Sequence, residues 1–230
     1  MSGIAKIQEK RDVVKANFNN PSSSFIGNKE IWLRDGDQIF CTPVASGEEG
    51  DPNLDEYYLY TFRSDNRWTH VLKHDEVDAS DVPTDIRPSH KFAFWAFVHE
   101  VMHDERRVDS WESVQGPGNR TLFKEVVDDF RIVALGFGRG DYVWNQLVEV
   151  YEEQGNLNGS VLRIKRTGSG AMDTSYDIKS TPRQLAIPES KGDEIGSLQL
   201  IGDYLLERYG GKQASSPQAE KLSVGLGDLF

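Results

Sequence analysis

Asn158–Thr181, NGSVLRIKRTGSGAMDTSYDIKST, is the stretch that decides the fold of this chain. Leu162 and Ile164 are apolar and lie two positions apart, with basic residues after each of them. Glycines at 168 and 170 mark a turn, and the period-two alternation resumes from 174 to 178. The stretch therefore predicts two antiparallel strands joined by a glycine-rich turn.

Two basic side chains occupy one face of the first of these strands. Arg163 and Lys165 are two residues apart, so both point away from the face of Leu162 and Ile164. This cationic face belongs to a chain whose formal net charge is −11. The pattern has two interpretations: the solvated outer face of an ordinary hairpin, or the wall of a groove that holds phosphates.

Composition limits the class of protein. The 230 residues suffice for one domain with appendages or for two small domains. No apolar run reaches the length of a membrane span, and the single cysteine, Cys41, is typical of a protein in the reducing cytoplasm. The glycine-rich loop at 136–140 matches neither a P-loop nor a dinucleotide-binding fingerprint. We therefore expect a cytoplasmic protein that uses no cofactor and contacts no membrane.

The chain divides into four parts by composition. Residues 1–24 are a basic amphipathic arm and a linker, which either pack on their own domain or contact a neighbouring copy. Residues 25–188 predict a mainly β core with added helices, and residues 189–210 a C-terminal helix packed on that core. Residues 211–230 predict a flexible tail. The tail ends in Asp228, Leu229 and Phe230, which are typical of a partner-docking peptide.

Aromatic residues mark the strongest predicted strands. Residues 57–62, YYLYTF, alternate so that three rings share one face. Residues 91–102, KFAFWAFVHEVM, are the most apolar segment, and Trp95 and Phe97 lie on one of its faces. That face is either plain core or a platform on which bases stack. Residues 121–135 predict a short helix that leads into a strand.

One motif indicates a different chemistry. HEVMH, with His99, Glu100 and His103, fits the H-E-x-x-H pattern of zinc peptidases, and Glu125 is a candidate third ligand. That pattern holds zinc only on a helix, and on a strand the two histidines would lie about 13 Å apart. A second possible zinc set, which no spacing demands, is His70, His74, His90 and Cys41. We interpret this second set as unliganded side chains, and no bound metal is expected.

The order of parts resembles the single-stranded DNA-binding (helix-destabilising) proteins of tailed phages. The resemblance is carried by 30–37 with its LRDGD turn, by the GDYVWNQ helix, and by GSVLRIKRTGSGAMDTSYDI. It implies an oligonucleotide-binding (OB) fold, a five-stranded barrel, with flanking helices. It also implies self-association along DNA through the arm, replication or recombination partners for the tail, and a location in the host cytoplasm. This chain departs from the family in lacking the zinc-binding cysteines and a strongly acidic tail.

On this resemblance we expect a non-enzymatic protein that coats single-stranded DNA during phage replication, recombination and repair. The alternatives are a zinc metallopeptidase that uses HEVMH and a β-rich structural protein of a virion. The side chains expected to line a basic aromatic DNA cleft are Tyr58, Tyr60, Phe62, Arg67, Trp68, Lys73, Trp95, Phe97, Arg139, Arg163, Lys165, Arg166 and Tyr176.

Overall fold

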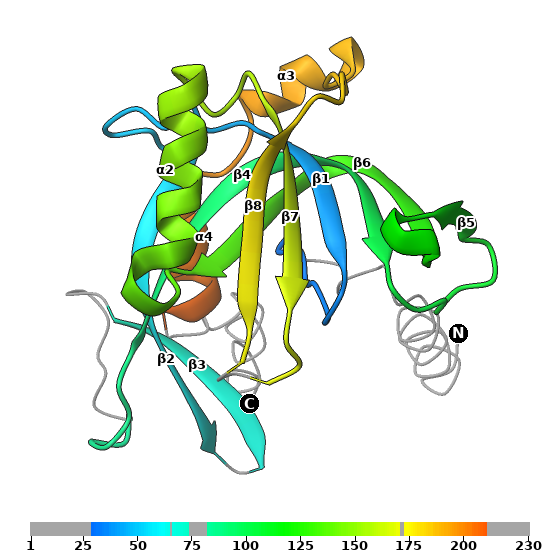
Figure 1. The fold of residues 1–230 in the computed structure, drawn as a ribbon. Helices are drawn as coiled ribbons and strands as arrows, with labels where there is room; N and C mark the ends of the chain where they lie inside the picture. The colour runs from blue at the N-terminus through cyan, green and yellow to red at the C-terminus, as the bar shows by residue number, and fades with distance from the viewer. Residues whose placement is uncertain (1–28, 65, 74–81, 171–172, 211–230) are drawn as a thin grey trace, which may run out of the picture.

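The computed structural model describes residues 29–64, 66–73, 82–170 and 173–210 (Figure 1). The described chain is mainly antiparallel β-sheet with a few helices, which confirms the predicted fold class at that level. The strands are β1 (Gln38–Pro43), β2 (Leu54–Ser64), β3 (Arg67–Lys73), β4 (Ser89–His103), β5 (Glu112–Gln115), β6 (Thr121–Gly136), β7 (Val161–Thr167) and β8 (Ser175–Thr181). The helices are α2 (Tyr142–Gln154), α3 (Gly192–Ile195) and α4 (Ile201–Tyr209). The arm at 1–24, His74 and the tail at 211–230 with Asp228, Leu229 and Phe230 lie outside the described residues.

β4, which the alternation at 91–102 predicts as a strand, lies at the centre of the sheet and pairs with three others. One edge of β4 pairs with β6 along almost its whole length, from Lys91 opposite Gly136 to His103 opposite Phe123. On the other edge, the first half of β4 pairs with β2 and the second half with β1. A register shift after Val98 bends the strand, as β-bulges do. The sheet therefore divides into a β2–β3 hairpin on one side and a curled path, β5-β6-β4-β1-β7-β8, on the other.

β7 and β8 form the hairpin that the opening stretch predicts. β7 pairs with β8 on one edge, with Ile164 opposite Ile178, and with β1 on the other. Gly168 begins the turn with a φ of +93°, and a Cβ there would lie 2.1 Å from the carbonyl oxygen of Asp173. Only glycine avoids that clash, so the turn depends on this residue.

Helix α2 covers one face of the curled path. Its buried side chains Val143, Leu147 and Val150 pack with sheet residues such as Phe92 and Phe94. The helix begins directly after Asp141 and ends at Gly155, the positions that the sequence favours, although the Asp141 side chain makes no capping hydrogen bond. The inward-facing residues of β1, β4, β6, β7 and β8 thus form one hydrophobic core with α2.

Helix α4 covers the opposite face, over β2, β3, β4 and β6. Ile201 and Leu205 of α4 pack with Trp95, Phe97 and Phe130 of the sheet. The indole Nε1 of Trp95 donates a hydrogen bond to the carbonyl of Gln199, at 2.7 Å, just before α4 begins. This second core fixes the C-terminal segment to the sheet.

Two local predictions were wrong. Residues 121–135, predicted to begin as a helix, belong to the 16-residue strand β6, because pairing with β4 on one edge and β5 on the other overrides a weak helical pattern. The single helix predicted within 189–210 is divided into α3 and α4. The amide of Ser197 donates to the carbonyl of Glu194 at 3.0 Å, which closes a tight turn where a longer helix would continue.

Candidate nucleic-acid interface

Three segments meet the solvent at the same end of the molecule. In Figure 1 the β2–β3 hairpin and the tip of β7–β8 both point toward the lower side, and α2 begins beside them. Residues 32–36 are attached to the β7–β8 tip, because Arg166 Nη1 donates to the Leu33 carbonyl at 2.6 Å and the Gly168 amide donates to Asp35 Oδ1 at 2.8 Å. We call the end of the molecule made by residues 32–36, 58–64, 66–73 and 139–142, with the described residues of the β7–β8 tip, the hairpin end.

The hairpin end carries every exposed aromatic side chain in the described part of the chain. Trp32 is 71% exposed, Trp68 70%, Tyr142 57% and Tyr58 39%. Rings left this open contribute little to a core, and a protein rarely leaves several of them together without a partner. Their free π-faces can stack on nucleotide bases without regard to base identity.

Tyr58 is held at the outer end of a column of rings. Its ring stacks on His90 with centroids 4.5 Å apart, and His90 stacks on Phe137 at 3.6 Å. Phe137 then stacks on Trp144 of α2 at 5.3 Å. Glu56 Oε1 lies 2.6 Å from Nε2 of His90 and keeps that imidazole in place. The orientation of Tyr58 is therefore fixed before any ligand arrives, which lowers the entropy cost of stacking on it.

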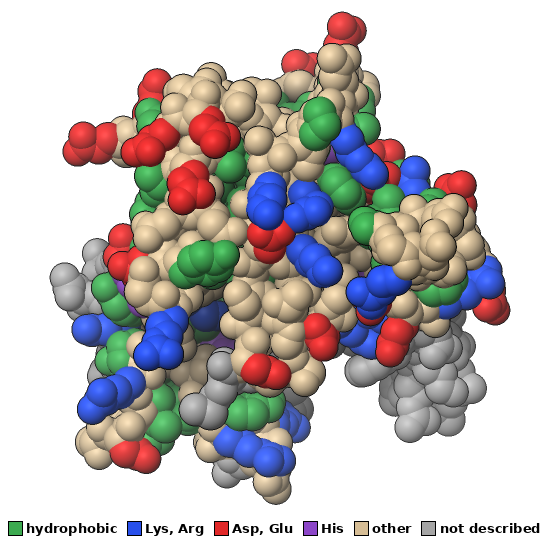
Figure 2. Space-filling view, in the orientation of Figure 1, with side chains coloured by type: hydrophobic (Ala, Val, Ile, Leu, Met, Phe, Trp, Pro, Cys, Tyr) green, Lys and Arg blue, Asp and Glu red, His purple; other side chains and the backbone are tan. Residues whose placement is uncertain are grey.

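Positive charge is available at the same end. Five exposed cationic side chains here make no ion pair with any residue that the structure describes: Arg34, Arg63, Arg67, Lys73 and Arg139. Lys73 Nζ lies 5.5 Å from the centroid of the Tyr58 ring, so a cation and a stacking surface adjoin each other. Figure 2 shows acidic side chains gathered over α2 and basic ones over the centre and lower part. Exposed carboxylates of Asp35, Asp141 and Asp173 also lie at this end, among the cations.

Some predicted DNA-binding rings are placed elsewhere. Trp95 is 2% exposed and Phe97 0%, because α4 covers the face of β4 on which they lie. Neither ring can stack on a base in this fold, so their proposed role was wrong. Phe62 is also buried, and Tyr60 is half-buried on the face of Tyr58.

Arg166 and Tyr176 lie opposite each other at the β7–β8 tip but face inward. Besides Leu33, the Arg166 guanidinium bonds Thr174 Oγ1 at 3.1 Å, so it positions the turn. Tyr176 is half-buried against the α2 core, and burial raises the pKa of its hydroxyl. Gln146 of α2 donates to the Tyr176 carbonyl at 3.1 Å. These two residues support the hairpin end and do not form its outer surface.

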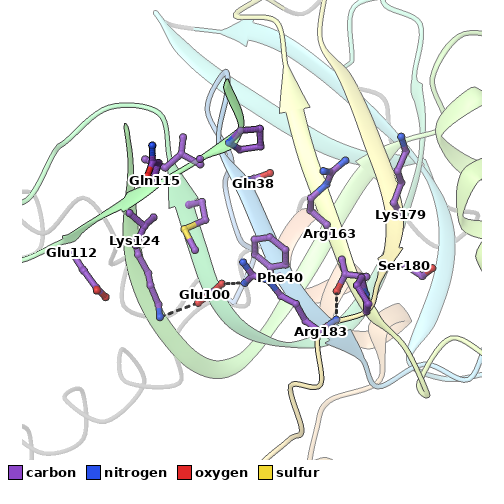
Figure 3. A pocket seen from close by; sticks show the side chains of 17 residues that line it. Gln38, Phe40, Glu100, Glu112, Gln115, Lys124, Arg163, Lys179, Ser180 and Arg183 are labelled. Carbon is purple, nitrogen blue, oxygen red and sulfur yellow. Dashed lines mark hydrogen bonds and ion pairs between the residues drawn. The ribbon is translucent and has the colours of Figure 1, made fainter. Parts of the chain in front are cut away.

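Arg163 and Lys165 share a face, as the spacing predicts, but it is the face of β7 away from α2 and away from Tyr58. Arg163 forms an ion pair with Asp177 of β8. It also lines a separate groove (Figure 3). The structure therefore does not bring this pair of cations together with the exposed rings.

HEVMH lies within strand β4, so His99 and His103 are not one helical turn apart, as the two zinc-binding histidines of H-E-x-x-H peptidases are. His99 Nε2 lies 2.9 Å from Thr42 Oγ1, whereas His103 Nε2 lies 2.8 Å from Glu125 Oε2. Among the described residues, no three histidine, cysteine, aspartate or glutamate side chains converge as metal ligands would. Burial raises the pKa of the Cys41 thiol to about 12, so it is a poor ligand at neutral pH.

His103 instead belongs to a buried polar network. Asp37 receives two hydrogen bonds from Arg107, at 2.9 and 3.0 Å, and lies 3.3 Å from His103 Nδ1. Burial favours neutral His103, but its contacts with Asp37 and Glu125 outweigh burial and raise the imidazole pKa. Burial likewise opposes ionised Asp37, and hydrogen bonds from His103 and Arg107 prevail to lower its pKa. The network anchors the start of β1, next to the LRDGD turn.

Sequence reasoning missed several residues of the hairpin end. Trp32 and Arg34 belong to the LRDGD turn, which was interpreted as an ordinary strand and turn. His90 is the second residue of β4, Phe137 lies in the glycine-rich loop at 136–140, and Tyr142 begins α2. The position of Trp32 directly before the glycine-containing LRDGD turn could have indicated an exposed ring, because a side chain next to a surface turn has few core residues to pack against.

Comparison of the chain with protein-family models and with curated proteins finds no match. Among the described helices the longest is α2, whose 13 residues are too few to cross a membrane.

Proposed function

We propose that this protein binds single-stranded DNA at the hairpin end. The observation that carries the proposal is the presence, at one end of the molecule, of the exposed rings Trp32, Tyr58, Trp68 and Tyr142 together with cations that have no described ion-pair partner. Trp68 lies on the α4 side of the β2–β3 hairpin and Tyr58 on the α2 side, so a bound strand would contact both faces of this hairpin. Bases stack on rings and phosphates pair with cations, so this combination fits a flexible single strand better than a protein surface. In double-stranded DNA the base faces are stacked on each other, so only the phosphates could contact this site, through its cations.

The connectivity supports an OB-type core for this site. β1, β4, β6, β7 and β8 give five strands with α2 between the third and the fourth, and β1 pairs with both β4 and β7. If β1, β4, β6, β7 and β8 correspond to the five OB strands in order, the β2–β3 hairpin lies in the connection from the first to the second of them, between β1 and β4. Gly168–Gly170 then lies in the connection from the fourth to the fifth, between β7 and β8. Those are the two connections through which OB folds hold oligonucleotides. Both contribute to the hairpin end.

Within this proposal the protein is non-enzymatic and resembles the tailed-phage proteins that coat single strands during replication, recombination and repair in the host cytoplasm. Trp32, Trp68 and Tyr58 supply stacking faces, and Arg67 and Lys73 hold phosphates. Neither role reads base identity, so the protein coats any sequence. The basic arm and the tail keep their predicted roles in self-association and partner binding.

The test is a fluorescence anisotropy titration of labelled oligo-dT, repeated across a range of salt concentrations. Each phosphate neutralised contributes a log–log slope of about −0.7 for a single strand. An Arg67→Ala/Lys73→Ala variant should therefore bind more weakly and flatten the slope by about 1 to 1.5 units. A matched Arg120→Ala/Lys191→Ala variant removes two ion-paired cations outside the hairpin end, one exposed and one half-buried, and should keep the wild-type slope.

Two results would overturn the proposal. The wild type and both variants could show equal salt slopes, or the wild type could show no affinity for oligo-dT at low salt. A wild type that prefers duplex DNA to oligo-dT would also contradict it, because the exposed rings would then have no role.

A further inference from the structure

A groove of about 600 Å³ lies on the face of the curled sheet opposite α2 (Figure 3). Its floor is apolar and consists of Phe40 of β1, Met102 of β4 and Leu122 of β6, all buried. Its two walls come from β5 and β8, the first and last strands of the path β5-β6-β4-β1-β7-β8. The groove is separate from the hairpin end, because none of the exposed rings lines it.

Cations outnumber carboxylates in this groove. The lining contains Lys124, Arg163, Lys179 and Arg183 against two acidic residues, Glu100 and Glu112. Arg183 and Lys124 both pair with Glu100, the lysine at 3.2 Å. Arg163 and Lys179 likewise share Asp177, the lysine at 3.4 Å. Glu100 and Asp177 thus each face two cations, and with Glu112 the four cations exceed the three carboxylates by one, so the groove favours a further negative group.

A buried donor also lacks an acceptor here. The Nε of Arg163 is inaccessible to solvent and makes no hydrogen bond with any described residue. The Nε atoms of Arg107 and Arg166, which do not line the groove, are buried without a described partner in the same way. The charge balance and the apolar floor of the groove, and not this atom, therefore indicate the kind of ligand.

The backbone of one groove wall favours a peptide. Among the described strands, β5 pairs only with β6, so this wall ends in an open sheet edge. The outer edge of β8 is occupied in its middle by Gln146 of α2, which accepts from the Ile178 amide at 2.8 Å and donates to the Tyr176 carbonyl at 3.1 Å. Extended peptides add to open edges and place alternate side chains in adjoining pockets. The Phe40 ring is covered by Arg183, whose guanidinium lies 3.8 Å from the ring centroid, so no ring is open for stacking on a base.

We propose that this groove binds an extended acidic peptide segment of a partner protein, one that alternates carboxylates with large apolar side chains. The carboxylates pair with Lys179, Arg163 and Lys124, and the apolar side chains rest on the floor around Met102 and Leu122. The backbone of the peptide follows the open edge of β5. This interaction is independent of DNA binding at the hairpin end.

The experiment uses the full chain and a fluorescein-labelled peptide, Asp-Asp-Leu-Asp-Phe-Asp-Leu-Asp. We expect the wild type to bind it with a dissociation constant in the range of about 1–100 µM. A Lys179→Glu/Arg183→Gln variant should bind about tenfold more weakly or worse, since both cations leave the rim. The matched control Lys191→Glu/Arg120→Gln changes one half-buried and one exposed cation outside the groove and should bind like the wild type. Circular dichroism and oligo-dT affinity, both unchanged, establish that the groove variant is folded.

Four results would overturn the inference. The wild type could fail to bind the peptide at about 1 mM, or bind a version with lysine in place of aspartate equally well. Unlabelled oligo-dT could displace the peptide, which would assign the groove to nucleic acid. Deletion of residues 211–230 could tighten peptide binding about tenfold, which would assign the groove to the tail of this chain.

Discussion

Replacement of Trp68 by alanine tests the stacking role of the hairpin end most directly. Trp68 lies on β3 opposite Arg63 and is 70% exposed, so its ring contributes little to the free energy of folding. Stacking of a base on one aromatic ring is worth about 1–3 kcal/mol. The substitution should therefore weaken oligo-dT binding by about 5- to 150-fold. Because no charge is removed, the salt slope should stay at its wild-type value.

The assay is oligo-dT anisotropy at three or more salt concentrations, together with thermal melting of the free protein. Trp68→Phe is the control, since a smaller ring in the same place should retain most of the affinity. Unchanged affinity in Trp68→Ala, with an unchanged melting temperature, would refute the assignment of this ring to a base. A fall in melting temperature of more than a few degrees would contradict the claim that the ring is outside the core.

Other expectations concern the fold and the buried network. Leu147→Ala removes a fully buried side chain of α2 and should lower the free energy of unfolding by about 2–5 kcal/mol, measured in urea. Because the fold raises the pKa of His103, the protonated imidazole stabilises the fold fully below about pH 6.5, its unfolded pKa, and this contribution is lost as pH rises through the folded pKa. His103→Gln should remove this pH dependence from a series of melting temperatures. Purified protein should contain well under one zinc per chain, and EDTA should leave its oligo-dT affinity unchanged; stoichiometric zinc would revive the HEVMH alternative.

Local patterns predicted the strands well but could not decide which faces are covered. The alternation at 91–102 places Trp95 on one face, yet whether that face is core or surface depends on α4, about a hundred residues later in the chain. For the same reason the three rings at 58–62 differ in exposure although they share a face. Position on a face follows from spacing, whereas burial follows from tertiary packing.

Sequence spacing was equally unable to show which charged side chains come together in the fold. Arg163 and Lys165 were conspicuous because they lie two residues apart on one strand, but Arg163 shares Asp177 with Lys179 and lines the groove instead of the hairpin end. The cations at Arg34 and Arg139 are isolated in the sequence and come to one end only through the fold. Trp32 was missed because its segment continues into a turn bound to β7–β8 instead of a regular strand.

The position of β1 between β4 and β7 has a consequence during protein synthesis. Ile39 of β1 pairs with Val101 on one side and with Ile164 on the other. A ribosome that adds about 5–20 residues per second needs several seconds to supply the first partner and about twice that time to supply the second. Until β7 emerges, one side of an apolar strand is open to pairing with other nascent chains. The delay makes the nascent protein a substrate for chaperones, and slow translation between β4 and β7 should increase aggregation.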